Sequence, residues 1–326
     1  MLLTIEELNK TAQMHPQVAE FYQRYPQPQR KFDVHVYRAF LRSNTEMSLA
    51  RLGPAPPDML EFYHNIEMRD GTSSTLKVFK PRCGPPGPLV VLCFGGGFVA
   101  GDHDQLTETA RISVQLFGAT VVNISYRVAP EAKFPTQQLD AWDSVKWIAE
   151  NATTDVLAAD PTKGFILGGV SAGAAITAAL SRQFQVDKLA HELTGQWLAV
   201  PSVMDINSCP VEYRNFLISH QQNANTPMLS RAVTDVMRDA VETYFQVDGM
   251  DLLRDEGLIY DEMLRTAGVQ TKLDLYPGCP HAHWPMMRGL EVANKALIDT
   301  IVGLGWLLEM DVSRERAADV LGVPLA

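Results

Sequence analysis

The sequence predicts an α/β fold, with a mainly parallel central sheet flanked by helices and a small helical cap. Two observations lead to this prediction. Short continuous apolar runs, typical of strands buried on both faces, recur along the chain, and helical stretches separate most of them. Strands that alternate with helices in this way form a parallel sheet covered on both sides. The length of 326 residues suits one large domain or one domain with a cap.

The beginning of the chain lacks this alternation. Residues 1–55 are helical and amphipathic in pattern, with an interruption at the proline-rich YPQPQR, and we expect an N-terminal helical arm that contributes to the cap. The segment RLGPAPPDML, which holds three prolines, is typical of a linker. We assign 56–201 and 241–326 to the core. Residues 202–240 interrupt the alternation with polar, helix-like sequence and are assigned to a shortened cap insertion.

Within the core, the elements follow one another in a regular order. FYHNIEMRD and TLKVFKP are separated by the turn-rich DGTSS and predict a hairpin. The buried-strand pattern then begins at PLVVLCF and recurs in TVVNIS, GFILGG, QWLAV, ETYFQV and KLDLYP. Helices are expected at TETARISVQLFG, TQQLDAWDSVKWIAENA and GLIYDEMLRTAG. No internal repeat interrupts this order.

Composition and charge exclude several classes of protein. The chain is 46% hydrophobic and carries a formal net charge of −10, without the basic stripe that nucleic-acid binding requires. MLLTIEELNK lacks the pattern of a secretory signal, and the apolar ALIDTIVGLGWLLEM is too short to span a bilayer. Cys83, Cys93, Cys209 and Cys279 form no CxxC pair, which is typical of free thiols in a reducing compartment. We therefore expect a cytoplasmic protein with no nucleic-acid partner and no membrane span.

The strongest local signal for chemistry is GFILGGVSAGAAITAAL. An apolar strand runs into Ser171, which is flanked by Gly169 and Gly173, and continues as an alanine-rich helix. A nucleophilic serine needs this setting because a tight strand-to-helix turn holds its hydroxyl clear of the backbone. The helix that follows directs its N–H groups and dipole at developing negative charge. We interpret Ser171 as a nucleophile.

A second signal is the glycine run Gly95, Gly96 and Gly97, which follows the buried strand PLVVLCF. By itself such a run is equally well explained as a flexible turn. Upstream of a nucleophilic serine it has a more definite use, because backbone N–H groups without side chains can reach an oxyanion.

Five blocks in this order resemble the hormone-sensitive-lipase type of α/β hydrolase: FGGGF, YRVAPEAKFP, GVSAG, MDLLRDEG and PHAHW. Blocks matching the family extend from about residue 60 to 308, and YRVAPExxFP and DxLRDEG are much more specific than GxSxG. The resemblance implies the α/β-hydrolase fold and carboxylesterase activity on a small-molecule ester or acyl substrate, with no metal or organic cofactor. Members of this group often form homodimers. Stretches such as GLIYDEMLRTAGVQTKLDLYPG are typical of fungal members.

The resemblance also implies roles for individual residues. Ser171 falls on the nucleophile, Asp251 on the acid and His281 on the base, in the chain order that this fold uses. The backbone donors of the oxyanion hole fall on Gly96, Gly97 and Ala172.

From the residues alone, these assignments have rivals. Asp255 and Glu256 could supply the acid, although they lie a helical turn further on and look more like surface or structural charges. His283 could be the base. His281 and His283 could also form a metal pair, but no third ligand suggests itself.

The chain departs from the family pattern at several positions. Phe94 replaces the usual histidine before the glycine run, Val170 the usual aspartate before the serine, and Ala174 a glycine. His283 stands where an aromatic residue is common. The connection from MLSRAVTDVMRDAV to the next strand is unusually short. We interpret it as a shortened cap insertion, which would open or reshape the pocket for the acyl or alcohol group.

Three functions are compatible with these observations. The first is a carboxylesterase for small or medium esters. The second uses the same site without net hydrolysis, as a dehydratase, a cyclase or an enzyme that releases polyketide or thioester intermediates in secondary metabolism. The third is a non-catalytic small-molecule receptor like the gibberellin receptor, which the intact His281 disfavours.

Overall fold

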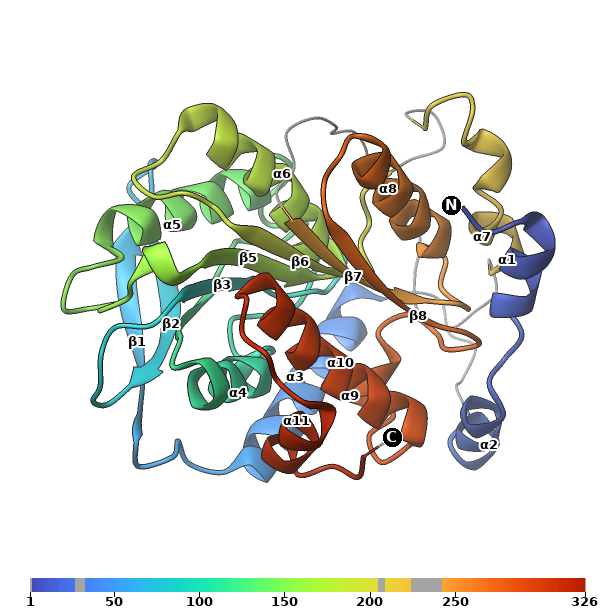
Figure 1. Ribbon diagram of the computed structural model, residues 1–326, viewed down its shortest axis with the longest axis horizontal. Coiled ribbons are helices and arrows are strands. Elements are labelled where there is room, and N and C mark those ends of the chain that lie inside the picture. The colour runs from blue at the N-terminus through green and yellow to red at the C-terminus, as the bar shows by residue number, and fades with distance from the viewer. Residues whose placement is uncertain (1, 27–32, 205–208, 224–241, 326) are drawn as a thin grey trace.

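An eight-stranded sheet forms the centre of the molecule in the computed structural model, which describes residues 2–26, 33–204, 209–223 and 242–325 (Figure 1). In chain order the strands are β1 (Met59–Glu67), β2 (Ser73–Pro81), β3 (Leu89–Cys93), β4 (Thr120–Ile124), β5 (Phe165–Val170), β6 (Gly195–Ala199), β7 (Glu242–Asp248) and β8 (Thr271–Tyr276). Across the sheet they follow the order β1-β2-β4-β3-β5-β6-β7-β8. Only the pairs β1–β2 and β2–β4 are antiparallel. The predicted mainly parallel sheet and its leading hairpin are confirmed.

The apolar runs in the sequence correspond to the central strands. Every residue of β3, β4, β5 and β6 is buried, as expected for strands covered on both faces. Parallel strands of this kind place their carboxyl ends along one edge, where ligands bind in open α/β sheets.

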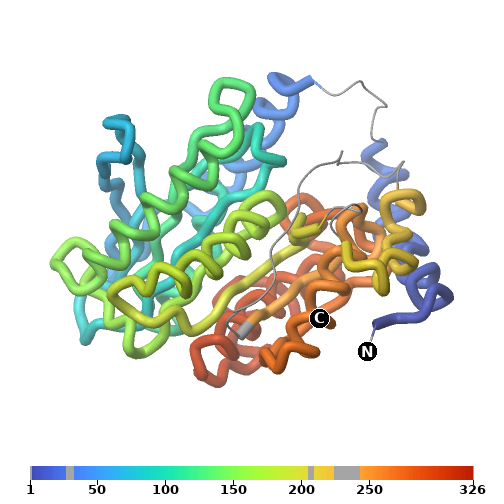
Figure 2. Tube along the Cα trace, turned by 90° about the horizontal axis from the view of Figure 1, so that it is seen from above, coloured from blue at the N-terminus to red at the C-terminus, as the bar shows by residue number. Residues whose placement is uncertain are grey.

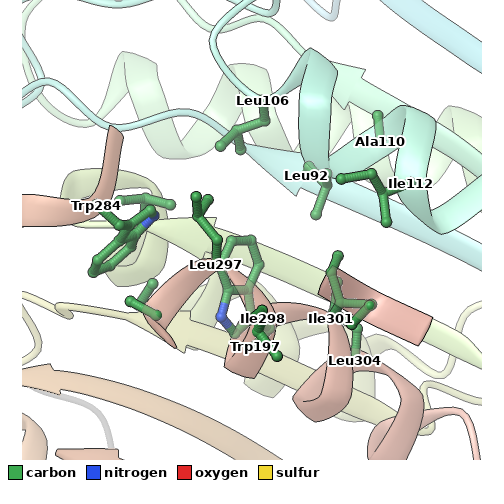
Figure 3. Close-up of a cluster of buried hydrophobic side chains, with 14 of the residues drawn as sticks. Leu92, Leu106, Ala110, Ile112, Trp197, Trp284, Leu297, Ile298, Ile301 and Leu304 are labelled. Atoms are coloured by element: carbon green, nitrogen blue, oxygen red, sulfur yellow. The ribbon is translucent and has the colours of Figure 1, made fainter. Parts of the chain in front are cut away.

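Helices cover both faces of the sheet (Figure 1). On one face lie α4 (Thr107–Phe117), α10 (Glu291–Leu307) and α11 (Arg314–Leu321). On the other lie α5 (Thr136–Asn151), α6 (Ala172–Asp187) and α8 (Arg254–Thr266). Figure 3 shows the core beneath α4 and α10, where Leu92, Trp197, Ile298 and Ile301 meet. Trp284, from the short helix α9 (His283–Met286), joins the same cluster.

The first part of the chain is helical, as predicted. It forms α1 (Ile5–Thr11), α2 (Pro16–Arg24) and α3 (Val34–Leu52), which lie along the margin of the molecule (Figure 2). Arg38 of α3 donates to the carbonyl oxygens of Val99 and Ala129, at 2.7 Å each. Arg254 reaches the other end of the arm, donating to the carbonyl oxygen of Leu8 at 2.8 Å. The arm is therefore bound to two loops and to the start of α8.

The second segment assigned to the cap is described in part. It contains the short helices η2 (Arg214–Phe216) and α7 (Ser219–Gln222), whereas the helix-like MLSRAVTDVMRDAV lies outside the described residues. One further short helix, η1 (Pro161–Lys163), precedes β5. Within the described ranges, we find no helix with the length and hydrophobicity needed to cross a membrane. All four cysteines are unpaired.

Candidate active site

Ser171 occupies the turn between β5 and α6. Its backbone has φ +56° and ψ −119°, a conformation that side-chain-bearing residues rarely adopt. The neighbouring glycines permit the turn, because a Cβ atom on Gly173 would lie 2.2 Å from the carbonyl oxygen of Cys93. One on Gly169 would lie 2.3 Å from the carbonyl oxygen of Gly173. The sequence pattern GVSAG thus produces a strained, tightly packed turn that presents Ser171.

Three side chains from distant parts of the chain form a continuous hydrogen-bonded series with Ser171 at one end. The Nε2 atom of His281 lies 2.9 Å from the Oγ atom of Ser171, and its Nδ1 atom lies 2.8 Å from Oδ2 of Asp251. The other carboxylate oxygen of Asp251 accepts the N–H of Leu253 at 3.0 Å. All three side chains are buried. This geometry allows His281 to accept a proton from Ser171 while Asp251 orients the ring.

Two opposing effects set the pKa of His281. Burial disfavours the imidazolium form, but the charge of Asp251 and the hydrogen bond to it outweigh this effect. The pKa of His281 is therefore raised above its ordinary value.

The glycine loop packs directly against the serine turn. A Cβ atom on Gly95 would lie 2.8 Å from the carbonyl oxygen of Val170, so this contact requires glycine. The N–H of Gly95 is occupied, because it donates to Oε1 of Gln105 at 2.7 Å. In contrast, the N–H groups of Gly96, Gly97 and Ala172 donate to no group among the described residues. These three donors remain available for a ligand. Gln105, which fixes the loop, carries no signal in the sequence that would have revealed it.

Phe94, the residue before the glycine run, anchors this loop through apolar packing. Its ring is buried and stacks on Tyr126, with ring centroids 4.0 Å apart and an angle of 9° between the planes. The hydroxyl of Tyr126 donates to the carbonyl oxygen of Phe94 at 2.6 Å. Stacking and a backbone hydrogen bond thus hold the loop at the position where the family resemblance leads one to expect a histidine.

A sequence profile described as the alpha/beta hydrolase fold matches residues 90–285, more than half of the chain. The chain belongs to the α/β-hydrolase family. Within it, the relatives place this chain in the hormone-sensitive-lipase and carboxylesterase-like group. An AB hydrolase superfamily protein of Schizosaccharomyces pombe is 32% identical, over 78% of this chain and 82% of its own length. Versiconal hemiacetal acetate esterase of Dothistroma septosporum is 27% identical, over 81% of this chain and 86% of its own length.

Solved structures of α/β hydrolases agree with this placement. Vibralactone cyclase superposes with a TM-score of 0.84 at 27% identity and covers 95% of this chain and 98% of its own. An esterase of Pyrobaculum calidifontis superposes with a TM-score of 0.71 at 25% identity and covers 92% of this chain and 100% of its own. The family therefore includes both esterases and a cyclase.

The rival acids of this α/β hydrolase have other partners. Asp255 accepts the N–H groups of Ile218 and Ser219 at 2.7 and 2.6 Å. Glu256 accepts the N–H of Met204 at 2.9 Å and lies 3.0 Å from Nε2 of His220. Both carboxylates are buried, so the interpretation as surface charges is wrong and the structural one holds. The reason is that they bind the backbone of the segment that follows β6.

The rival base, His283, also faces elsewhere. Its Nδ1 atom lies 2.9 Å from Oδ1 of Asp248, and its Nε2 atom lies 3.2 Å from the carbonyl oxygen of Val292. The two histidines therefore bind different aspartates, and only His281 contacts Ser171.

Proposed function

We propose that this α/β hydrolase is a serine hydrolase that cleaves a small or medium carboxylic ester through an acyl-enzyme on Ser171. The observation that carries the proposal is the hydrogen-bonded series from Ser171 through His281 to Asp251, beside a loop with available N–H donors. Its esterase relatives support the same class of reaction.

In the proposed mechanism, the Oγ atom of Ser171 attacks the ester carbonyl while Nε2 of His281 takes its proton. His281 then returns the proton to the leaving alcohol, and the acyl group remains on Ser171. A water molecule, deprotonated by His281, attacks the acyl-enzyme, and His281 returns this proton to Oγ of Ser171 as the bond to the acyl group breaks and the acid leaves. Asp251 keeps the imidazole ring oriented and stabilises the imidazolium that forms in each half of the cycle.

The negative oxygen of the tetrahedral intermediate would be bound by the N–H groups of Gly96, Gly97 and Ala172. These donors are fixed in place before the reaction, because Gln105 holds Gly95 and Ala172 begins α6. Preorganised donors of this kind each contribute about 3–4 kcal/mol to the transition state.

The proposed size of the substrate rests on the cap. A cavity of about 300 Å³ lies between α2, α3 and the turn after His283, with Phe21, Tyr22 and Met286 in its wall, and its lining includes neither the Ser171–His281–Asp251 series nor the glycine loop. We propose that residues 1–55 and 202–240 together form a cap over the 56–201 and 241–326 core, which would disfavour large lipid aggregates.

Ester turnover beside a mechanism-based label tests this function. We expect the protein to hydrolyse p-nitrophenyl acetate and to be labelled by a fluorophosphonate, and Ser171→Ala to lose both. Ser181→Ala is a matched control, because Ser181 is a buried serine of α6, the helix that follows Ser171, and its hydroxyl donates to the carbonyl oxygen of Thr177 at 2.8 Å. Labelling that persists in Ser171→Ala would show that the nucleophile lies elsewhere.

A second candidate is an intramolecular acyl transfer without net hydrolysis, as in a cyclase or an enzyme that releases a thioester intermediate. The structural likeness to vibralactone cyclase favours it, together with the apolar Phe94–Tyr126 stack beneath the loop. Phosphonate labelling of Ser171 without turnover of any simple ester is the result expected for this candidate. If the reaction is run in ¹⁸O-labelled water, no ¹⁸O should then enter the product.

Two further properties are proposed. Cys93, Cys209 and Cys279 are buried thiols, which are typical of a reducing compartment, so we propose a cytoplasmic location. The family resemblance suggests a homodimer, and light scattering of the purified protein tests it.

A further inference from the structure

Two histidine–aspartate pairs connect the same two segments of the chain. Asp248 ends β7 and Asp251 follows three residues later, while His281 and His283 flank Ala282 in the turn after β8. One pair joins His281 to Asp251 at 2.8 Å, and the other joins His283 to Asp248 at 2.9 Å. Each segment therefore contributes one residue to each pair.

The partners of His283 determine its protonation. Its Nδ1 atom faces a carboxylate oxygen of Asp248, and its Nε2 atom faces the carbonyl oxygen of Val292. With the Asp248 carboxyl ionised, both partners are acceptors, and both ring nitrogens then carry hydrogen to make both bonds. A protonated Asp248 would instead donate to Nδ1 of a neutral ring. The charge of Asp248 raises the pKa of His283, which favours the imidazolium–carboxylate pair, and both side chains are fully buried.

The partners of His281 have the opposite consequence. Its Nδ1 atom also faces a carboxylate, but its Nε2 atom faces the hydroxyl of Ser171, which can donate as well as accept. The ring can thus be neutral and take up a proton. The second partner of each ring therefore determines its role. Ser171 allows His281 to act as a base, whereas the carbonyl oxygen of Val292 favours the charged form of His283.

We propose that His283 is a positioning residue. Its ion pair with Asp248 holds the turn that carries His281 against the loop that carries Asp251. This inference rests on the proposed function of Ser171, His281 and Asp251. Ala282, the single residue between the two histidines, has φ +50°, a conformation that residues with side chains rarely adopt. Holding His283 in place therefore also fixes the backbone of His281. Trp284 on the other side is fixed in the hydrophobic core beneath α10 (Figure 3).

The groups that face the two pairs come from several elements. Asp248, Asp251 and Glu256 contribute charge at this site, and Cys279 and the ring of Tyr276 lie beside His283. The pKa of His283 is accordingly raised to about 10, because the charge of Asp248 and the hydrogen bond to it outweigh the effect of burial. Burial raises the pKa of Asp248 itself, an effect that His283 opposes.

Nitrogen NMR of protein labelled in its histidines tests the protonation directly and requires no turnover. We expect one histidine to be doubly protonated at about pH 8 and its signals to be absent from His283→Phe. In Asp248→Asn the same ring should titrate in the ordinary histidine range. A neutral ring assigned to His283 at this pH in the wild type would overturn the proposal.

The positioning role is tested on the neighbouring pair. We expect His283→Phe, which retains an aromatic ring, and Asp248→Asn to slow phosphonylation of Ser171 and kcat about 10-fold to 100-fold, with little change in KM. The low-field proton resonance of the His281–Asp251 hydrogen bond should weaken in both. Asp143→Asn is the control, because it breaks an ion pair between the buried Asp143 and the exposed Arg69 at the other edge of the sheet.

The outcomes separate this inference from the proposed function. If the wild type shows no labelling, the function of Ser171 fails, while the His281–Asp251 resonance still decides whether His283 positions that pair. If both variants keep this resonance and the rate of the wild type, or if Asp143→Asn slows the reaction equally, His283 is not a positioning residue.

Discussion

The ring of Phe94 stacks on the ring of Tyr126, and the Tyr126 hydroxyl also donates to the carbonyl oxygen of Phe94. The same pair of residues thus makes a side-chain contact and a backbone contact immediately before the glycine loop. In the proposed mechanism, this double contact fixes the position of the loop relative to Ser171.

Tyr126→Phe should therefore affect both stability and rate. The substitution retains the stack but leaves the buried carbonyl of Phe94 without this donor, at a cost of about 1–3 kcal/mol in the free energy of unfolding. We expect a several-fold slower phosphonylation of Ser171 as the loop relaxes. Urea unfolding and labelling kinetics measure the two effects. Tyr244→Phe is the control, since its hydroxyl bonds to Asp274 at 2.8 Å, away from the loop, and should lower stability alone.

Alanine substitutions at two adjacent glycines should have different consequences. A Cβ atom on Gly96 would lie 2.2 Å from the carbonyl oxygen of Ala100, so Gly96→Ala should disrupt the loop and destabilise the fold. A Cβ atom on Gly97 meets nothing within 4 Å. Gly97→Ala should fold, with about 1–2 kcal/mol of strain from its φ of +60°, and lose activity because the methyl group enters open space beside the donors. Thermal melting and ester turnover distinguish the two; an active, stable Gly96→Ala would contradict this loop geometry.

The rate should depend on pH through His281. Catalysis requires the neutral ring, so activity is lost as pH falls through the pKa of His281, which lies above the ordinary histidine value. Asp251→Asn removes the charge that raises this pKa, which should move the acid limb of the kcat/KM profile to lower pH. The variant should also lower kcat about 10³–10⁴-fold, because the ring loses its orientation. An acid limb that stays in place in Asp251→Asn would exclude this carboxylate as the cause.

Asp255 and the segment after β6 give a prediction about local unfolding. Asp255 binds the N–H groups of Ile218 and Ser219 as well as the guanidinium of Arg254. Asp255→Asn weakens these charge-assisted bonds, and we expect faster proteolysis within 209–223, read by mass spectrometry of the fragments. Asp143→Asn, whose partner lies at the far edge of the sheet, should leave this cleavage rate unchanged.

Stability should also depend on pH, through His283. The pKa of this residue is raised to about 10 in the folded protein from an ordinary value of 6.5, so the folded state holds a proton that the unfolded state loses. Its contribution is fully present below about pH 6.5 and is lost as pH rises through about 10. The free energy of unfolding should fall across this window in the wild type and change less in the double variant His283→Phe with Asp248→Asn. Urea titrations at several pH values test this, and parallel curves for the two proteins would falsify it.

Local patterns in the sequence determined much of this molecule. Continuous apolar runs predicted the buried strands β3 to β6, because residues buried on both faces must be apolar at every position. The strand–glycine–serine–glycine–helix pattern also predicted the turn at Ser171, whose geometry depends on residues adjacent in the chain. The choice of Asp251 and His281 depended on the family resemblance.

Only the tertiary structure separated the neighbouring candidates. His281 and His283 are both histidines in one short turn, and Asp251, Asp255 and Glu256 are acids within six residues. Their differences lie in partners more than 25 residues away: Ser171 and Asp251 for His281, Asp248 for His283, and the 204–220 segment for Asp255 and Glu256. Hydrogen bonds between distant segments form only when the sheet brings the ends of β5, β7 and β8 to one edge. The sequence therefore determined where reactive groups lie, and the fold decided which of them meet.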